Sequence, residues 1–314
     1  MVIEGDEYPS SFFDKEPKFL HYTPFALILT NLEYDHADIY PDISSLKEVF
    51  KKLINLVPEE GIIVYNYDDK NLKEVINSSS PKAKLISYGR NPKAHFVLLE
   101  SKTSFKNSCF INSVLADTPF EKALKFSISI PGEYNALNAL SVLALLYGLN
   151  FLNNKWTKAF KNFPGIKRRQ EIIYADNKLF IVDDFAHHPT AVKETLKELK
   201  KVIEPEKTVI IFEPRTNSSK RKVFQKDYIK SLSLADVVYI KIPPGLENIP
   251  EEERLDIEYV IEALKKESLK VFLWEKKLKY GIISGGKFLI LFMSSAYFEE
   301  LKNLKKILFD SRKL

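Results

Sequence analysis

The strongest constraint on the fold is an alternation of apolar runs and amphipathic stretches after residue 165. The apolar runs have the length of buried strands and lie at 178–185, 208–214, 236–241, 270–274 and 287–293. The stretches between them with helical periodicity lie at 189–202, 222–233 and 255–266. Because parallel strands need crossover helices, this part of the chain is predicted to be a Rossmann-like α/β domain with a mostly parallel sheet.

The first half follows the same pattern less regularly. Buried strands are predicted at 25–30 and 61–66, with an amphipathic helix at 42–57 between them. Short β-like pieces at 84–130 precede a buried helix at 133–149. A further helix ends at Pro164-Gly165, so we expect two α/β domains, 1–164 and 165–314.

Composition narrows the possible partners and the compartment. The 314 residues are 45% hydrophobic and 28% charged, and the net charge of +5 comes from lysines that acids nearly balance. No basic stripe is interleaved with aromatic residues, so we expect no nucleic-acid partner. No apolar run reaches about 18 residues and no signal peptide is recognisable, which predicts a cytoplasmic protein without a membrane partner. The single cysteine, Cys109, is interpreted as a small buried side chain.

Polar side chains follow two apolar runs near the start of the chain. The run 25–30 leads into TNLEYDHAD, which brings Asn31 and His36 together with several carboxylates. Glu4 follows the short run Val2-Ile3, which looks like the end of a core strand. Strand ends that supply oxygen and imidazole ligands suit a divalent metal such as Mg²⁺. The alternative is a polar loop in which Asp42 caps the next helix.

The stretch GEYNALNA places two asparagines at the start of the buried helix. Asn135 and Asn138 are three residues apart and therefore share one face. Asparagine amides can read an adenine edge by paired donor and acceptor contacts. A simple cap of the helix start is the competing interpretation.

The stretch DDFAHHPTAV joins a strand end to a helix whose first turn contains Pro189. Asp184 ends the strand, Phe185 follows, and His187 precedes the helix. A helix N-terminus favours anions, and histidine adds donors to a phosphate or carboxylate. Adjacent histidines lack the i, i+4 spacing of a helical zinc pair, and packing remains the simple alternative.

Two arginine-containing stretches lie near predicted strand ends. IKRRQE supplies Arg168 and Arg169, while FEPRTNSSKR supplies Arg215 beside Asn217. Guanidinium groups can hold a phosphate or carboxylate through two parallel hydrogen bonds. GIISGGKF (281–288) imitates a phosphate-binding loop, but Phe288 stands where Ser or Thr is needed and a strand follows.

These pieces, in this order, resemble the Mur ligase family, the ATP-dependent amide-bond-forming enzymes of bacterial cell-wall synthesis. The motifs that carry the resemblance are VIEGDEYPSSFFDKEPKFLHYTP, LTNLEYDHADIYPD, KRRQE, DDFAHHPTA and FEPRTN. FFDK…KFLHY and EPRTN favour the peptidoglycan-recycling branch over the alanine-adding one. The resemblance implies an incomplete central ATP-binding domain at 1–164, followed by the family's C-terminal domain at 165–314.

The resemblance also implies roles for the first-half residues. Glu4 would hold the Mg²⁺ that bridges the ATP phosphates, and His36 would bind a second Mg²⁺ while Asn31 orders the loop. Asn135 and Asn138 would contact adenine, although Tyr134 replaces the histidine that is usual before the first of them.

For the second half, the resemblance implies that Arg168 or Arg169 steadies the phosphates. Asp184 would contact the ribose, and Phe185 would lie against the base. SSAYFEE (294–300) replaces a glycine-rich stretch of the family.

The remaining implied roles concern the second substrate. His187, Arg215 and Asn217 would face the incoming peptide or the transferred phosphate. The implied reaction activates the carboxylate of UDP-N-acetylmuramate as an acyl-phosphate, which the amine of the tripeptide L-Ala-γ-D-Glu-meso-diaminopimelate then attacks.

The family's N-terminal UDP-binding domain and its P-loop have no counterpart in these residues. We therefore expect no ligase activity from this chain alone, with the missing part either on a separate polypeptide or lost from the reading frame. A non-catalytic module that binds nucleotide or peptide, and a metal-dependent phosphoesterase, are the alternatives.

Overall fold

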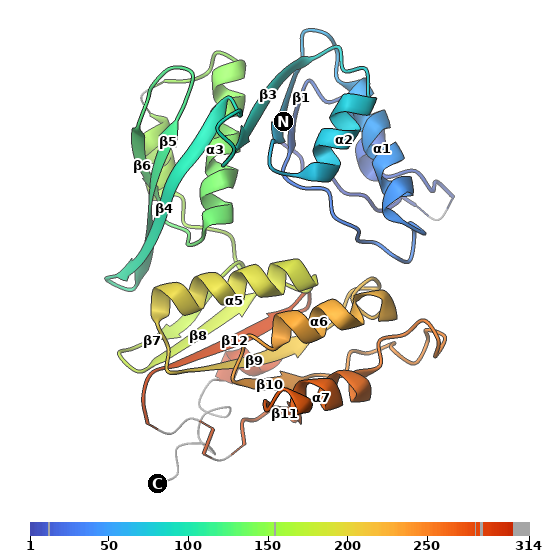
Figure 1. Ribbon diagram of the computed structural model, residues 1–314, viewed down its shortest axis with the longest axis vertical. Helices are drawn as coiled ribbons and strands as arrows, with labels where there is room; N and C mark the ends of the chain where they lie inside the picture. Colours follow the sequence, from blue (N-terminus) through green and yellow to red (C-terminus); the bar gives the residue numbers. More distant parts are fainter. Residues whose placement is uncertain (12, 154, 280, 283–284, 304–314) are drawn as a thin grey trace. The chain divides into compact units, whose positions relative to one another are not determined.

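The computed structural model describes residues 1–11, 13–153, 155–279, 281–282 and 285–303 (Figure 1). The chain divides into two compact units. Unit 1 comprises Met1–Ser104 and Phe110–Phe163, and unit 2 comprises Phe105–Cys109 and Pro164–Leu314. Each unit is built around its own six-stranded sheet, so the α/β fold class expected from the alternating pattern is confirmed.

The sheet of unit 1 has the strand order β1-β2-β3-β4-β5-β6. Its strands are β1 (Ala26–Leu29), β2 (Ile62–Asn66), β3 (Lys84–Gly89), β4 (Phe96–Lys106), β5 (Cys109–Asp117) and β6 (Leu124–Ile128). The pairs β1–β2, β2–β3 and β3–β4 are parallel, whereas β5 and β6 are antiparallel. The parallel part of the sheet is therefore its first half, as the alternating sequence predicts.

Helices pack against the sheet of unit 1. They are α1 (Ile43–Leu56), α2 (Lys70–Ser78), α3 (Glu133–Gly148) and α4 (Trp156–Asn162), with a short 3₁₀ helix at Lys18–His21. Asp42 caps α1 by accepting a hydrogen bond from the backbone N–H of Ser45, and Asp69 caps α2 in the same way. The second of these helices was not predicted from sequence.

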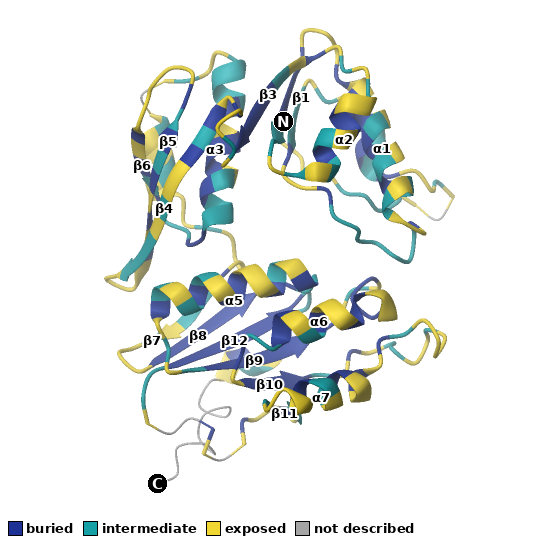
Figure 2. Ribbon diagram, in the orientation of Figure 1, coloured by how far each residue is buried: buried dark blue, intermediate teal, exposed yellow. Residues whose placement is uncertain are grey.

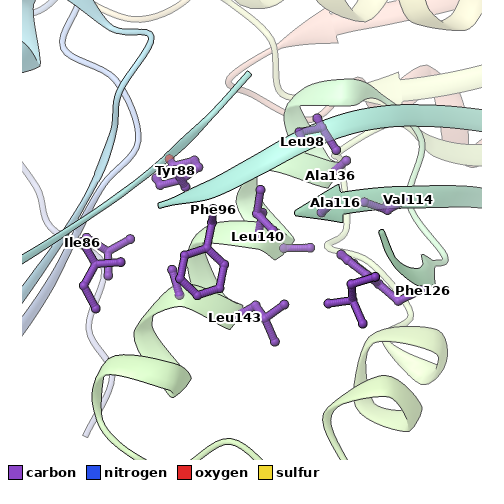
Figure 3. Packing of buried hydrophobic residues seen from close by; sticks show 14 of the residues in the cluster. Ile86, Tyr88, Phe96, Leu98, Val114, Ala116, Phe126, Ala136, Leu140 and Leu143 are labelled. Carbon is purple, nitrogen blue, oxygen red and sulfur yellow. The ribbon is translucent and has the colours of Figure 1, made fainter. Parts of the chain in front are cut away.

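Two hydrophobic clusters hold unit 1 together. One lies between α3 and the strands β2 to β6, where Phe96, Leu140 and Leu143 are fully buried (Figure 3). The other joins α1 and α2 to β1 and β2. The almost entirely apolar sequence of α3 buries one face of the helix completely and leaves most of its other residues partly buried (Figure 2). Asn138 and Val142 are its exposed positions.

The opening residues do not form the core strand that their sequence suggested. Residues 1–7 have no regular structure, and Val2 and Ile3 are exposed. A strand needs a neighbour to satisfy its backbone groups. Strand β1 is hydrogen-bonded to β2 and ends the sheet within the described residues.

The sheet of unit 2 has the strand order β11-β10-β9-β12-β8-β7. Its strands are β7 (Glu171–Ala175), β8 (Leu179–Asp184), β9 (Lys207–Glu213), β10 (Val237–Ile240), β11 (Lys270–Leu273) and β12 (Phe288–Ser294). All neighbours are parallel except β7, which pairs antiparallel with β8 and was not predicted. The four central strands are almost entirely buried, as expected for a parallel sheet.

Three helices connect the parallel strands of unit 2. They are α5 (Pro189–Ile203), α6 (Gln225–Leu232) and α7 (Ile257–Lys266), with short 3₁₀ helices at Lys222–Phe224 and Glu299–Asn303. Pro189 stands at the first turn of α5, where its missing N–H costs nothing. The crossovers place the carboxyl ends of β8, β9, β10 and β12 at one edge of the sheet.

Three sequence expectations need separate comment. Cys109 is exposed at the start of β5, so the prediction of a buried side chain was wrong. The stretch that imitates a phosphate-binding loop lies partly outside the described residues, as does the Lys-rich helix that the sequence also predicts at the end of the chain. In the part of the chain that the structure describes, no helix is both long enough and apolar enough to cross a bilayer.

The packing of α3 leads to a stability prediction for unit 1. Replacing the fully buried Leu140 by Ala leaves a cavity and is expected to cost about 2–5 kcal/mol of unfolding free energy. Trp156 packs against this cluster, so its fluorescence in a Trp274→Phe background reports urea unfolding of unit 1.

Val142→Ala on the same helix is the control for that measurement, because 38% of the Val142 side chain is exposed. The control should unfold at nearly the same urea concentration as the parent chain. Equal midpoints for the Leu140 and Val142 variants would contradict the assignment of α3 to the core.

Candidate functional site

Arg168 ties together two strand ends in unit 2. Its guanidinium donates to three successive carbonyl oxygens at the end of β12 and just after it, those of Ser294 (2.6 Å), Ser295 (3.1 Å) and Ala296 (2.6 Å). The Nε atom lies 3.3 Å from Oδ2 of Asp183 on β8. Four of the five guanidinium N–H groups are thereby engaged, so Arg168 organises the carboxyl edge of the sheet.

The backbone around Arg168 is equally constrained. Its φ of 60° lies in the left-handed region, its N–H donates to Glu171 (2.8 Å), and its carbonyl accepts from the N–H of Phe185 (2.6 Å). A non-glycine residue holds such a conformation only where its surroundings determine it. These contacts fix the segment 168–170 against the end of β8.

Two buried carboxylates end β8. Asp184 accepts hydrogen bonds from the backbone N–H groups of Gln170 (2.8 Å) and Ala186 (2.7 Å). Burial raises the pKa of Asp184 to about 6, although both backbone bonds and Arg169 act in the opposite direction. Burial likewise raises the pKa of Asp183, against the lowering effect of Arg168.

Arg169, Phe185 and His187 lie together beside these acids. The exposed guanidinium of Arg169 lies 4.7 Å from the ring centroid of Phe185. The ring of His187 meets that of Phe185 edge-on at 5.3 Å, and its Nδ1 donates to the Phe185 carbonyl (2.9 Å). Two residues singled out from sequence, Arg169 and His187, therefore lie against the partly exposed ring of a third, Phe185.

A second ionic group lies at the end of β9. Glu213 is fully buried and accepts a hydrogen bond from the Ser294 hydroxyl (3.1 Å). Nη1 of Arg215 lies 3.3 Å from one carboxylate oxygen of Glu213, and Nζ of Lys241 lies 3.5 Å from the other. Asn217 is exposed in the turn that follows.

In unit 1, His36 lies among acids and tyrosines. Its Nε2 is 3.4 Å from a carboxylate oxygen of Glu7, and the ring of Tyr8 contacts it edge-on at 4.3 Å. Burial lowers the pKa of His36, but the hydrogen bond to Glu7 and the charges of Asp35 and Asp38 outweigh that effect and raise it. Its Nδ1 is buried without a hydrogen-bond partner.

Glu4 and Asn31, the two residues expected to act with His36, do not contact it. Glu4 is exposed, and the carboxylate that contacts His36 belongs to Glu7. Asn31 is exposed after β1, where its amide donates to Glu33 (3.3 Å). Across the described ranges, no group of three or more His, Cys, Asp or Glu side chains could hold a metal ion by itself.

A Mg²⁺ ion needs fewer protein ligands when phosphate oxygens complete its shell. The Nδ1 atom of His36, which is buried without a hydrogen-bond partner, could serve as a nitrogen ligand, and the carboxylate of Glu7 could serve as an oxygen ligand. These residues fit a Mg²⁺ ion that is shared with a phosphate better than one held by the protein alone.

The start of α3 is held by a buried polar network. The amide of Asn112, which is fully buried, donates to the carbonyl of Gly132 (2.9 Å) and accepts from the Ser101 hydroxyl (2.8 Å). The Asn135 amide donates back to the Pro131 carbonyl (2.6 Å), whereas Asn138 is exposed. Asn135 thus takes part in the turn before the helix, and its neighbour one turn later faces solvent.

Sequence reasoning missed Glu7, Glu213 and Lys241. Glu213 stands at the end of an apolar strand, just as Asp183 and Asp184 do, and that position was the available signal. Lys241 gave no such signal, because a lysine after a strand is common on protein surfaces.

Comparison with known families identifies both units. A model described as "Mur ligase middle domain" matches residues 11–146, and one described as "Mur ligase, glutamate ligase domain" matches residues 168–277.

Curated relatives agree with this identification. A UDP-N-acetylmuramate–L-alanyl-γ-D-glutamyl-meso-2,6-diaminoheptandioate ligase of Escherichia coli is 34% identical over 244 residues, which cover 77% of this chain and 51% of the relative. A UDP-N-acetylmuramate–L-alanine ligase of Caldicellulosiruptor saccharolyticus is 34% identical over 240 residues, which cover 76% of this chain and 50% of that relative. The chain therefore spans about half the length of these relatives.

Among solved structures, a murein peptide ligase from Psychrobacter arcticus is similar over the whole chain. The two structures match with a TM-score of 0.65 and 26% sequence identity. The match covers 100% of this chain and 63% of the ligase chain.

The buried acids at the end of β8 predict a pH dependence of stability. Because the folded-state pKa of Asp184 is raised to about 6 from 3.8, the folded state binds a proton that the unfolded state releases. This contribution, about 3 kcal/mol by linkage, is complete below about pH 4 and is lost as the pH rises through about 6.

Asp184→Asn removes the titrating group. The difference in unfolding free energy between parent and variant, followed by Trp274 fluorescence in a Trp156→Phe background, should change steeply between pH 4 and 6. A pH-independent difference would contradict the burial of an ionisable group at this position.

Proposed function

Since this chain belongs to the Mur ligase family, we propose that it forms the ATP-hydrolysing and peptide-accepting part of an amide-bond-forming ligase of peptidoglycan recycling. The observation that carries the proposal is the carboxyl edge of unit 2, where Arg169, Phe185 and Asp184 lie together beside a fixed strand end. Polar groups at the carboxyl ends of parallel strands are the usual ligand-binding position of an open α/β sheet.

The proposed substrates are UDP-N-acetylmuramate and the tripeptide L-Ala-γ-D-Glu-meso-diaminopimelate. The name of the Escherichia coli relative and the similarity to a murein peptide ligase support this choice. The similarity to an alanine-adding ligase is almost as strong, so the FFDK…KFLHY and EPRTN stretches are what favour the tripeptide. We place the reaction in the cytoplasm.

When bound, ATP with Mg²⁺ would supply the phosphoryl group that activates the muramate carboxylate. In unit 1, His36 with Glu4 or Glu7 would hold the metal, and Asn31 would order the loop. Asn135 and Asn138 would contact adenine. Charge neutralisation between anionic substrates is the main physical demand on such a site.

In unit 2, we assign the phosphate contact to Arg169 and not to Arg168. Four N–H groups of Arg168 are engaged by Asp183 and by three carbonyls, which leaves its guanidinium little capacity for a ligand. The Arg169 guanidinium is exposed and packs on Phe185, the residue proposed to lie against the base. Asp184 would contact the ribose.

The peptide would meet His187, Arg215 and Asn217. Arg215 and Asn217 are exposed near the end of β9, and the Nδ1 proton of His187 is directed to the Phe185 carbonyl. No side-chain nucleophile is needed, because the peptide amine itself attacks the activated carboxylate.

A phosphate cradle has to come from residues outside 1–314. The sequence contains no G-x-x-x-x-G-K followed by Ser or Thr, and backbone N–H groups with a lysine normally hold the β- and γ-phosphates. We propose that a further segment, on the same or a separate polypeptide, provides it.

The 314-residue chain alone is therefore expected to form no amide bond from UDP-N-acetylmuramate, tripeptide, ATP and Mg²⁺. Addition of a fragment carrying the phosphate-binding loop should restore product, measured by mass spectrometry. Robust product without the fragment contradicts the need for a cradle. Nucleotide binding that never leads to product, with or without the fragment, favours a binding module.

A separate experiment tests the assignment of the phosphate contact. Arg169→Met should weaken ADP binding about tenfold, because a charge-assisted hydrogen bond contributes about 1.5–3 kcal/mol. Lys193→Met, an exposed position on α5, is the matched control and should bind ADP like the parent. Unchanged ADP affinity of the Arg169 variant by calorimetry would remove this residue from the site.

A further inference from the structure

Lys241 and Arg215 flank the buried carboxylate of Glu213, and each keeps N–H groups that this contact does not use. Nζ of Lys241 lies 3.5 Å and Nη1 of Arg215 lies 3.3 Å from different oxygens of Glu213. Both distances exceed the ~2.8 Å of a well-formed charge-assisted bond. The side chains of Arg215 and Lys241 are 42% and 26% exposed, whereas that of Glu213 is inaccessible. Both cations thus contact the buried carboxylate of Glu213 and remain accessible to solvent.

The charges in this group do not cancel. Two cations meet one carboxylate, so the group carries one net positive charge at a strand edge. Glu213 also accepts a hydrogen bond from the Ser294 hydroxyl at 3.1 Å, a neutral donor that adds no charge to the group. A single external negative charge would balance the group.

The surroundings hold Lys241 in place. Its ammonium lies 4.8 Å from the ring centroid of Phe298, which is fully buried, and its backbone N–H donates to the Phe212 carbonyl (2.8 Å). Phe298 belongs to the stretch 294–300 that replaces the family's glycine-rich segment, and Arg168 fixes the carbonyls of that stretch. Lys241 is therefore pre-positioned by packing, which lowers the entropic cost of binding a ligand.

We propose that Lys241 is a specificity-determining residue that, with Arg215, binds a free carboxylate of the incoming peptide, with Glu213 as the positioning residue for both. The inference rests on the proposed function and extends it to a residue that the family resemblance did not assign. A carboxylate carries one charge and matches the group, whereas a phosphate monoester carries about −1.5 to −2.

Calorimetric titration of the 314-residue chain with L-Ala-γ-D-Glu-meso-diaminopimelate, and with the same peptide fully amidated, tests this proposal. The parent chain should bind the acid form more tightly than the amide. Lys241→Met should lose roughly tenfold in affinity for the acid form and nothing for the amide, while Lys241→Arg should restore binding. Lys230→Met, an exposed position on α6, is the matched control.

Equal affinity of the parent for acid and amide would overturn the proposal, and this comparison needs no variant. Unchanged acid affinity in both Lys241→Met and Lys241→Gln would also overturn it, as would competition by inorganic phosphate that depends on Lys241. ADP titration of the same proteins distinguishes a failure of this inference from a failure of the proposed function. Loss of the peptide effect with intact ADP binding contradicts only this inference, whereas ADP binding that stays absent after the fragment carrying the phosphate-binding loop is added contradicts the proposed function.

Discussion

The Arg168 guanidinium is the interaction on which the arrangement of unit 2 depends. It joins Asp183 at the end of β8 to three successive carbonyls that begin with the last residue of β12, and its own backbone is hydrogen-bonded to Glu171 and Phe185. A buried carboxylate such as Asp183 is costly unless it is paired, and carbonyls at a strand end are costly unless a donor reaches them. One side chain meets both needs, and the candidate ligand residues are arranged around it.

The other buried acids at the carboxyl edge of this sheet are also stabilised by hydrogen-bond donors or cations. Asp184 uses two backbone N–H groups, and Glu213 uses a hydroxyl and two cations. In each case at least one donor to the buried acid comes from a different segment, Gln170 for Asp184 and Ser294 for Glu213, so the acid fixes the position of that segment. Arg169, Arg215 and Lys241 are left partly exposed at this edge, which makes it suitable for anionic ligands.

Much of this fold could be predicted, because strands and helices of an α/β protein have strong local patterns. The buried strands β8, β9, β10 and β12 are continuous apolar runs, and α1 and α5 show clear helical spacing with Asp42 and Pro189 at their starts. The misses have local causes. Strand β7 is only half buried and pairs antiparallel at the sheet edge, and α2 is short and polar except for one face.

The sequence by itself determined the alternation of strands and helices, the motif order that identifies the family, and the set of polar residues at strand ends. It could not distinguish Arg168 from Arg169, or Glu4 from Glu7, because residues of the same type within a few positions of each other belong to the same local pattern. Only the tertiary structure decided these cases. It brings together residues that are far apart in the sequence, such as Arg168 and Ser294, which are separated by 126 positions. Contacts over such separations leave no mark on local periodicity.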